Sequence, residues 1–84
     1  MPQFQDTIGW AEYTRGDFQK SLAILESAEA KLPNSASVRY HLGMSYLATG
    51  ASEKASEQLK AALALEVDET PLKQKIRLAM KRVG

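Results

Sequence analysis

The sequence predicts an all-α fold, in which two successive helical hairpins and a closing helix form an α-solenoid of five helices. Three observations support this prediction. Similar residues recur at an offset of 34, apolar residues follow helical spacing within each segment, and no stretch shows the sustained period-two alternation typical of strands. The 84 residues then divide into a first repeat at 2–35, a second repeat at 36–69 and a C-terminal helix at 70–84.

The repeat is carried mainly by glycines and small residues, the types that turns and closely packed helices require. The matching pairs are Ile8 and Leu42, Gly9 and Gly43, Ala11 and Ser45, Gly16 and Gly50, Ser21 and Ala55, Leu25 and Leu59, and Ala28 and Ala62. Repetition at this interval is typical of solenoids, in which each helical unit packs on its neighbours.

Local signals place the helices of the first repeat. The first helix ends before Gly16, which can adopt the left-handed backbone conformation that terminates helices. Asp17 is a good N-cap for a second helix over 18–31. Pro33 prevents that helix from continuing and disfavours helical backbone at Leu32.

The second repeat follows the same plan. It begins near Ser35, breaks at Thr49 and Gly50, and resumes from Ser52 to about Glu66. Apolar residues at Val38, Leu42 and Tyr46 have the spacing of one helix face. Two antiparallel helices are therefore predicted here as well.

The C-terminal segment opens with Thr70 and Pro71, an N-cap followed by proline at the first helical position. One apolar stripe then contains Leu72, Ile76, Ala79, Met80 and Val83, while Leu78 lies outside it. A one-sided helix covers the apolar face that the last repeat of a stack would otherwise expose. We therefore predict a capping helix; a partner-binding or membrane-surface helix is the alternative.

Composition excludes several classes of protein. Apolar residues make up 44% and charged residues 25%, as in soluble globular domains. There is no cysteine for a disulfide or a thiolate metal site, and the single histidine cannot form a multi-histidine site, so we expect no cofactor or metal. Neither a signal peptide nor an apolar run of about 18 residues is present, so we expect no membrane insertion, while the compartment stays open.

Charge is distributed unevenly along the chain. Residues 1–69 contain six basic and ten acidic residues, whereas residues 70–84 contain five basic residues and no acidic one. A basic tail can contact nucleic acid or acidic lipid. We instead favour a basic outer face on the last helix, because nucleic-acid domains usually carry a larger basic patch with interleaved aromatic residues. We expect no nucleic-acid partner.

The two repeats resemble the tetratricopeptide repeat, a helix-turn-helix unit of 34 residues. The residues at the family's positions are Leu42, Gly43, Tyr46, Gly50, Ala55, Leu59 and Ala62 in the second repeat, and Ile8, Gly9, Gly16, Asp17, Phe18, Leu25, Ala28 and Pro33 in the first. A narrower resemblance involves residues 6–10 and 40–43, which are similar to the C-terminal ends of bacterial arrays among the lipoproteins associated with PEP-CTERM sorting and exopolysaccharide export.

The family resemblance implies a groove lined by the first helix of each repeat. The groove positions expected to contact a partner are Asp6, Trp10, Tyr13, Tyr40, His41, Met44 and Leu47. Aromatic residues anchor interfaces well because each removes a large area from water. These positions contain no lysine or arginine, so we expect no binding of the C-terminal carboxylates that chaperone-binding members clamp with basic residues.

We expect a non-catalytic module that binds a protein or peptide partner. His41 is the only histidine and no serine or cysteine motif accompanies it, and no glycine-rich phosphate loop is present. Two alternatives stay open. The chain can be the structural end of a longer array in bacterial envelope or exopolysaccharide assembly, or the aromatic strip can be covered by a second copy of the chain.

Overall fold

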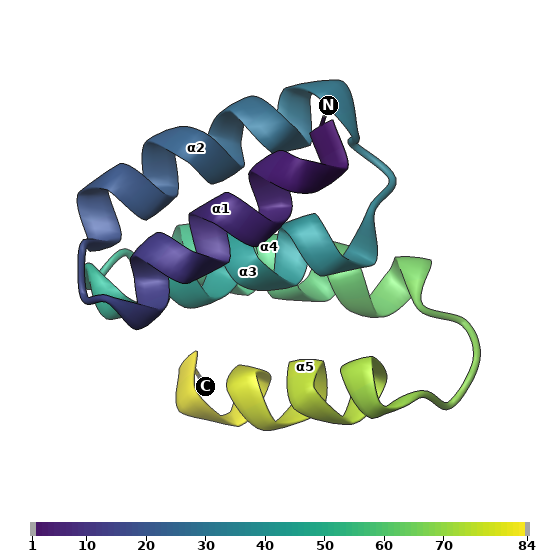
Figure 1. Ribbon diagram of the computed structural model, residues 1–84. Coiled ribbons are helices and arrows are strands. Elements are labelled where there is room, and N and C mark those ends of the chain that lie inside the picture. Colours follow the sequence, from purple (N-terminus) through teal and green to yellow (C-terminus); the bar gives the residue numbers. More distant parts are fainter. Residues whose placement is uncertain (1, 84) are drawn as a thin grey trace.

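The computed structural model describes residues 2–83, and within that range it contains five α-helices and no strand. The helices are α1 (Pro2–Thr14), α2 (Phe18–Lys31), α3 (Ala36–Ala48), α4 (Ser52–Leu65) and α5 (Pro71–Val83) (Figure 1). The predicted all-α fold is confirmed. The predicted repeat boundaries, after residues 35 and 69, both fall in the loops between helices.

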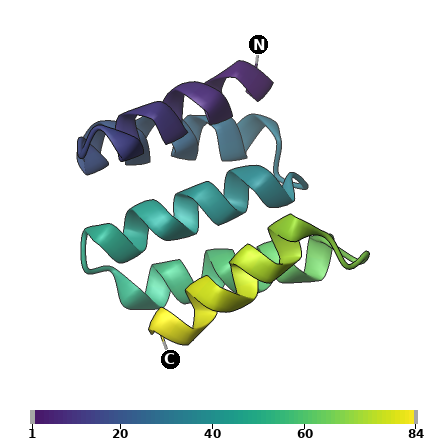
Figure 2. The same cartoon turned by 60° about the horizontal axis from the view of Figure 1, so that its bottom comes forward.

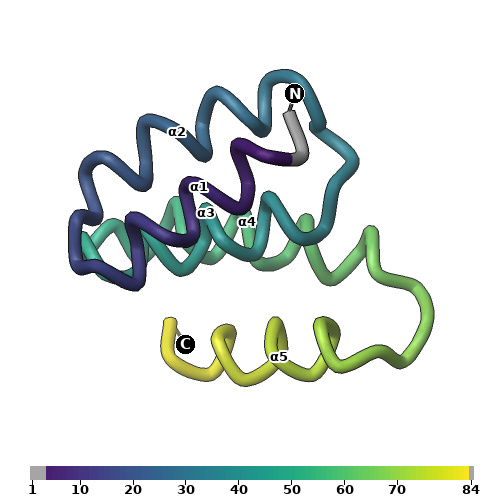
Figure 3. The backbone as a smooth tube through the Cα atoms, viewed as in Figure 1, coloured from purple at the N-terminus to yellow at the C-terminus, as the bar shows by residue number. Residues whose placement is uncertain are grey.

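The helices form a stack of antiparallel hairpins. The backbone reverses direction after every helix, so that α1 pairs with α2 and α3 pairs with α4 (Figure 3). Figure 2 shows these two hairpins and α5 as successive layers. We call the contact of the first hairpin with α3 the first junction, and the contact of the second hairpin with α5 the second junction.

The predicted turn and cap signals are confirmed. Gly16 has a φ of 89°, a left-handed conformation that glycine adopts without steric cost. The Asp17 side chain accepts a hydrogen bond from the Lys20 backbone N–H and caps α2, and Ser35 caps α3 in the same way. These local contacts fix where the helices begin and end.

Helix α3 lies at the centre of the stack, and its buried residues form the core. Val38 and Leu42 are fully or almost fully buried under the first hairpin. Gly43 faces the other way, toward α4, where a Cβ atom would lie 2.9 Å from the Leu59 side chain. Only glycine allows α3 and α4 to approach this closely, which explains why glycine recurs at this position.

Helix α5 packs against α4 and, to a smaller extent, α3. Ile76 and Ala79 are buried against Met44, Leu59 and Ala62. Leu78, which the sequence places outside the apolar stripe, is 62% exposed. The last helix therefore covers the apolar face of the second hairpin.

Candidate protein-binding site

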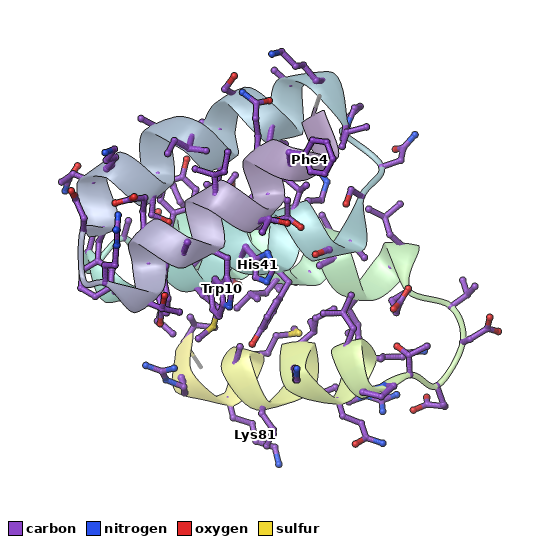
Figure 4. The ribbon with its side chains drawn as sticks, viewed as in Figure 1. Phe4, Trp10, His41 and Lys81 are labelled. Atoms are coloured by element: carbon purple, nitrogen blue, oxygen red, sulfur yellow. The ribbon has the colours of Figure 1, made fainter. Side chains whose placement is uncertain are left out.

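An aromatic cluster lies where α1 and α3 meet. The rings of Trp10 and Tyr13 are stacked with centroids 4.4 Å apart, and the His41 ring also stacks on Trp10, at 4.2 Å. Tyr40 lies at 6.0 Å from Trp10 in a tilted arrangement. Figure 4 shows Trp10 and His41 on the side of α1 and α3 that faces α5. The structure thus brings together four of the seven residues predicted to contact a partner.

Helix geometry explains how these residues meet. Trp10 and Tyr13 are three positions apart on α1 and therefore lie on one face of that helix. Tyr40 and His41 are adjacent on α3 and reach the same area, because α3 packs beside α1 in the first junction. All four side chains are half-buried. They are held in place by their neighbours and still present ring surface to solvent.

Asp6 joins the cluster through His41. The His41 Nδ1 and Asp6 Oδ1 atoms are 2.6 Å apart, and the Ser37 hydroxyl donates to Asp6 Oδ2 over 2.6 Å. Because a carboxylate only accepts, the His41 Nδ1–H donates this hydrogen bond to Asp6. Burial raises the pKa of Asp6, but the hydrogen bonds from His41 and Ser37 and the charge of His41 outweigh it, and the pKa lies below its usual value.

This pair restrains the two repeats relative to each other. The side chains of His41 and Asp6 are only 17% and 15% exposed, so the interaction is shielded from water. The sequence indicated that both residues lie in the groove but not that they bond to each other. Their separation of 35 positions is one more than the repeat length, a spacing that could have suggested a contact between neighbouring first helices.

Met44 is the most deeply buried of the predicted contact residues. It is only 8% exposed and belongs to the core cluster with Leu59 and Ile76. Its position faces α5, and the apolar stripe of α5 covers it. Leu47, the remaining predicted residue, is half-buried near the end of α3. Met44 therefore supports the binding face from beneath, and we omit it from the exposed contacts.

Helix α5 adds basic residues that sequence reasoning placed on an outer face. Tyr40 and Met44 of α3 line a pocket of about 170 Å³ together with Lys75, Leu78, Ala79 and Arg82 of α5. The expectation that the groove lacks lysine and arginine holds for α1 and α3 but not for the whole surface. We use the name binding face for the exposed or half-buried residues of this region: Asp6, Trp10, Tyr13, Tyr40, His41, Leu47, Lys75, Leu78 and Arg82.

A signal for this contribution was present in the sequence. Continuing the offset of 34 once more places Leu72, Ile76 and Ala79 at the positions of Val38, Leu42 and Ser45. Helix α5 therefore occupies the place of a third first helix, and the offset places Lys75 and Leu78 at the positions of His41 and Met44. The offset also aligns Lys81 with Leu47, but it is the next residue, Arg82, that lines the pocket. The predicted cap and the predicted groove are parts of one surface.

The described part of the chain was compared with two further kinds of site, a metal centre and a membrane span. Across residues 2–83 there is no group of three or more histidine, cysteine, aspartate or glutamate side chains that could hold a metal ion. None of the described helices has both the length and the hydropathy needed to cross a membrane. The arrangement of aromatic, histidine and basic side chains is suited to noncovalent contact with another molecule.

The chain matches the family model of the tetratricopeptide repeat over residues 13–77. No curated protein matches it. The matched range runs from the end of α1 through most of α5 and covers more than half of the chain. Tetratricopeptide repeats generally mediate interactions between proteins, and they typically serve as non-catalytic scaffolds. Together with the five antiparallel helices, this match establishes that the chain belongs to the tetratricopeptide repeat family.

Proposed function

We propose that this chain is a non-catalytic interaction module that binds an extended peptide or a helix of a partner protein along the binding face. The observation that carries the proposal is the stacked cluster of Trp10, Tyr13 and His41, half-buried beside Tyr40. Large aromatic side chains dominate the energetics of protein interfaces, because they bury much apolar area at a small cost in conformational entropy.

Preorganisation strengthens this proposal. Stacking with Tyr13 and with His41 restrains the Trp10 ring, and the short hydrogen bond to Asp6 holds His41 in place. A surface whose side chains are already ordered loses less entropy when a partner binds. The cluster is therefore better suited to specific binding than a set of mobile surface aromatics would be.

Trp10 makes the proposal directly testable. It is the only tryptophan, so its fluorescence reports on the binding face alone. Peptides would be selected from a random display library on the intact chain, and their affinities measured by Trp10 fluorescence and calorimetry. We expect Tyr40→Ala to weaken the selected peptides by about tenfold or more, as truncation of an interface anchor does.

Ile8→Ala is the matched control. Ile8 and Trp10 are two positions apart on α1 and therefore lie on nearly opposite faces of that helix. Ile8 is 51% exposed, so Ile8→Ala should remain folded, and circular dichroism would check that Tyr40→Ala, at a half-buried position, does so too. Selected peptides that bind Tyr40→Ala and a Trp10→Ala variant as tightly as the unaltered chain would contradict the proposal.

A second role is favoured by a separate observation, the exposed apolar residues Phe4 and Ile8 on α1. They are 57% and 51% exposed, and Ala11 extends the same face. Such a stripe suits stacking against a further helical unit, as at the end of a longer array, or against a second copy of the chain. A role in bacterial envelope or exopolysaccharide assembly rests on the two short sequence motifs alone.

Sedimentation equilibrium at several concentrations tests the self-association form of this role. If a second copy covers α1, the molecular mass should rise with concentration, and the double variant Phe4→Ser, Ile8→Ser should remain monomeric. A monomer at all concentrations would exclude self-association. The proposal that a partner binds the opposite face of α1, which carries Trp10, would still stand.

A further inference from the structure

The pocket between α3 and α5 indicates what kind of partner segment the binding face accepts. This inference rests on the proposed function. We propose that the pocket receives the carboxylate side chains of an acidic segment of a partner protein, which pair with Lys75 and Arg82, while an apolar side chain of the same segment packs on Leu78.

The pocket lies where the second junction has the positions equivalent to Asp6 and His41 of the first. Advancing by 34 residues converts Asp6, Trp10 and His41 of the first junction into Tyr40, Met44 and Lys75 of the second. In the first junction, His41 is bonded to the Asp6 carboxylate. In the second, Lys75 has Tyr40 across from it, and these two residues line an open pocket. The second junction repeats the geometry of the first but lacks the acidic group.

The basic residues of α5 differ in whether they have an acidic partner within the chain. Glu69 pairs with Lys73 at 3.5 Å and with Arg77 at 2.8 Å, so these two cations already have an acidic partner within the chain. Among the described side chains, no acidic group lies within ion-pair distance of Lys75 or Arg82. The two cations that face the pocket are thus the ones that an acidic partner can pair with.

The geometry of α5 sets the pattern that the partner needs. Lys75, Leu78 and Arg82 are spaced at i, i+3 and i+7, which places them along one face, with the two cations about 10 Å apart. In a peptide with polyproline II backbone, residues i and i+3 lie on the same side and are about 9 Å apart, close to this distance. A single terminal carboxylate can satisfy only one of the two cations. The complementary segment therefore has two acidic residues, three positions apart, with an apolar residue between them.

Arg82 lies close enough to Tyr40, in the lining of the pocket, to affect the pKa of the Tyr40 hydroxyl. Burial raises the pKa of Tyr40, and the neighbouring Tyr13 acts in the same direction, whereas the positive charge of Arg82 acts against both. The apolar part of the pocket, formed by Met44, Leu78 and Ala79, lies beside this charge. A partner side chain in the pocket thus encounters apolar surface flanked by cations.

The test uses the intact chain and three synthetic peptides of equal length. The first contains Glu-Leu-Ser-Glu between neutral flanking residues, the second replaces both glutamates by glutamine, and the third replaces the leucine by serine. Affinities are measured by calorimetry and Trp10 fluorescence at low and high salt. We expect the first peptide to bind about tenfold more tightly than either of the others, with the difference from the glutamine peptide shrinking as salt rises.

Variants of α5 locate the contact. Lys75→Glu and Arg82→Glu should each weaken the acidic peptide by about tenfold and leave the glutamine peptide almost unchanged. Lys81→Glu is the matched control, because Lys81 is adjacent to Arg82 and carries the same charge but points away from α1 and α3 (Figure 4). It changes net charge equally, and we expect less than about a threefold effect.

Two results would overturn the inference. One is equal binding of the glutamate and glutamine peptides. The other is an equal loss of affinity for the acidic peptide in Lys81→Glu and Arg82→Glu, which would indicate attraction by net charge. Anionic vesicles or a single-stranded oligonucleotide that compete with the acidic peptide equally well in all variants would indicate the same. If library-selected peptides still depend on Tyr40 after either result, the proposed function stands and only the acidic partner is excluded. If they do not, both proposals fail.

Discussion

The two junctions of the stack share one geometry but differ in chemistry. The first junction is tied by polar contacts: Asp6 bonds to His41, and the buried hydroxyls of Ser21 and Ser45 lie 2.8 Å apart. At the positions equivalent to these two serines, the second junction has Ala55 and Ala79, both buried. In the first junction these polar groups therefore pair with one another, while the second junction packs with apolar residues and leaves cations facing a pocket.

The same apolar stripe appears three times along the chain. Its members are Phe4, Ile8 and Ala11 in α1, Val38, Leu42 and Ser45 in α3, and Leu72, Ile76 and Ala79 in α5. The second and third copies are covered by the preceding hairpin, whereas Ile8 in the first copy is 51% exposed. What a helix buries here is decided by what precedes it in the stack, because the stripe itself is similar in all three.

The largest effect on stability should come from shortening buried side chains of the recurring apolar stripe. Leu42→Ala and Ile76→Ala each remove a fully buried side chain, so the free energy of unfolding should fall by about 2–5 kcal/mol. Ile8→Ala at the equivalent exposed position should cost about 1 kcal/mol or less. Urea denaturation of the three variants measures this. A cost for Ile76→Ala as small as that for Ile8→Ala would mean that α5 does not close the second junction.

A smaller effect is expected from Asp6→Asn, which removes the charge that pairs with His41. At neutral pH the free energy of unfolding should fall by about 1 kcal/mol. The folded state holds the pKa of Asp6 below its unfolded value. Its stabilisation is therefore fully present above about pH 4 and is lost as pH falls further through the folded pKa.

Urea denaturation at a series of pH values checks this prediction. The difference between the unaltered chain and Asp6→Asn should shrink as pH falls below about 4. Asp68→Asn, in the exposed loop before α5, is the control and should show no such trend. A pH-independent difference for Asp6→Asn would show that the carboxylate charge contributes nothing to the first junction.

The smallest effect concerns the hydroxyls of the first junction. Each of Ser21 and Ser45 can donate one hydrogen bond, and both also reach a backbone carbonyl, Gly9 O at 2.8 Å and His41 O at 3.0 Å respectively. Ser21→Ala or Ser45→Ala alone should cost about 1 kcal/mol. The double variant reproduces the alanine pair of the second junction. Its loss in free energy of unfolding should be no larger than that of either single variant. Strictly additive costs would contradict a shared hydroxyl pair.

The sequence was sufficient for the helices but not for all contacts between them. Gly16, Asp17 and Thr70 act within a few residues of their own position, so their effects on helix ends could be predicted. The offset of 34 predicted how hairpins stack. The burial of Met44 and the place of Arg82 at the pocket depend instead on how α5 packs on the second hairpin. That packing joins distant segments, and neither local signals nor the offset encode it. Lys75 differs, because the offset places it at the position of His41.

Thiol labelling at one repeated position tests the stack most directly. The chain contains no cysteine, so Ile8→Cys, Leu42→Cys and Ile76→Cys each introduce a single reporter. Under native conditions, the thiol of Ile8→Cys should react at a rate close to that in denaturant. The thiols of the other two variants should react at least about a hundredfold more slowly than in denaturant. Rapid labelling of Ile76→Cys in a chain that remains helical would contradict closure by α5, and strong protection of Ile8→Cys would contradict an open first helix.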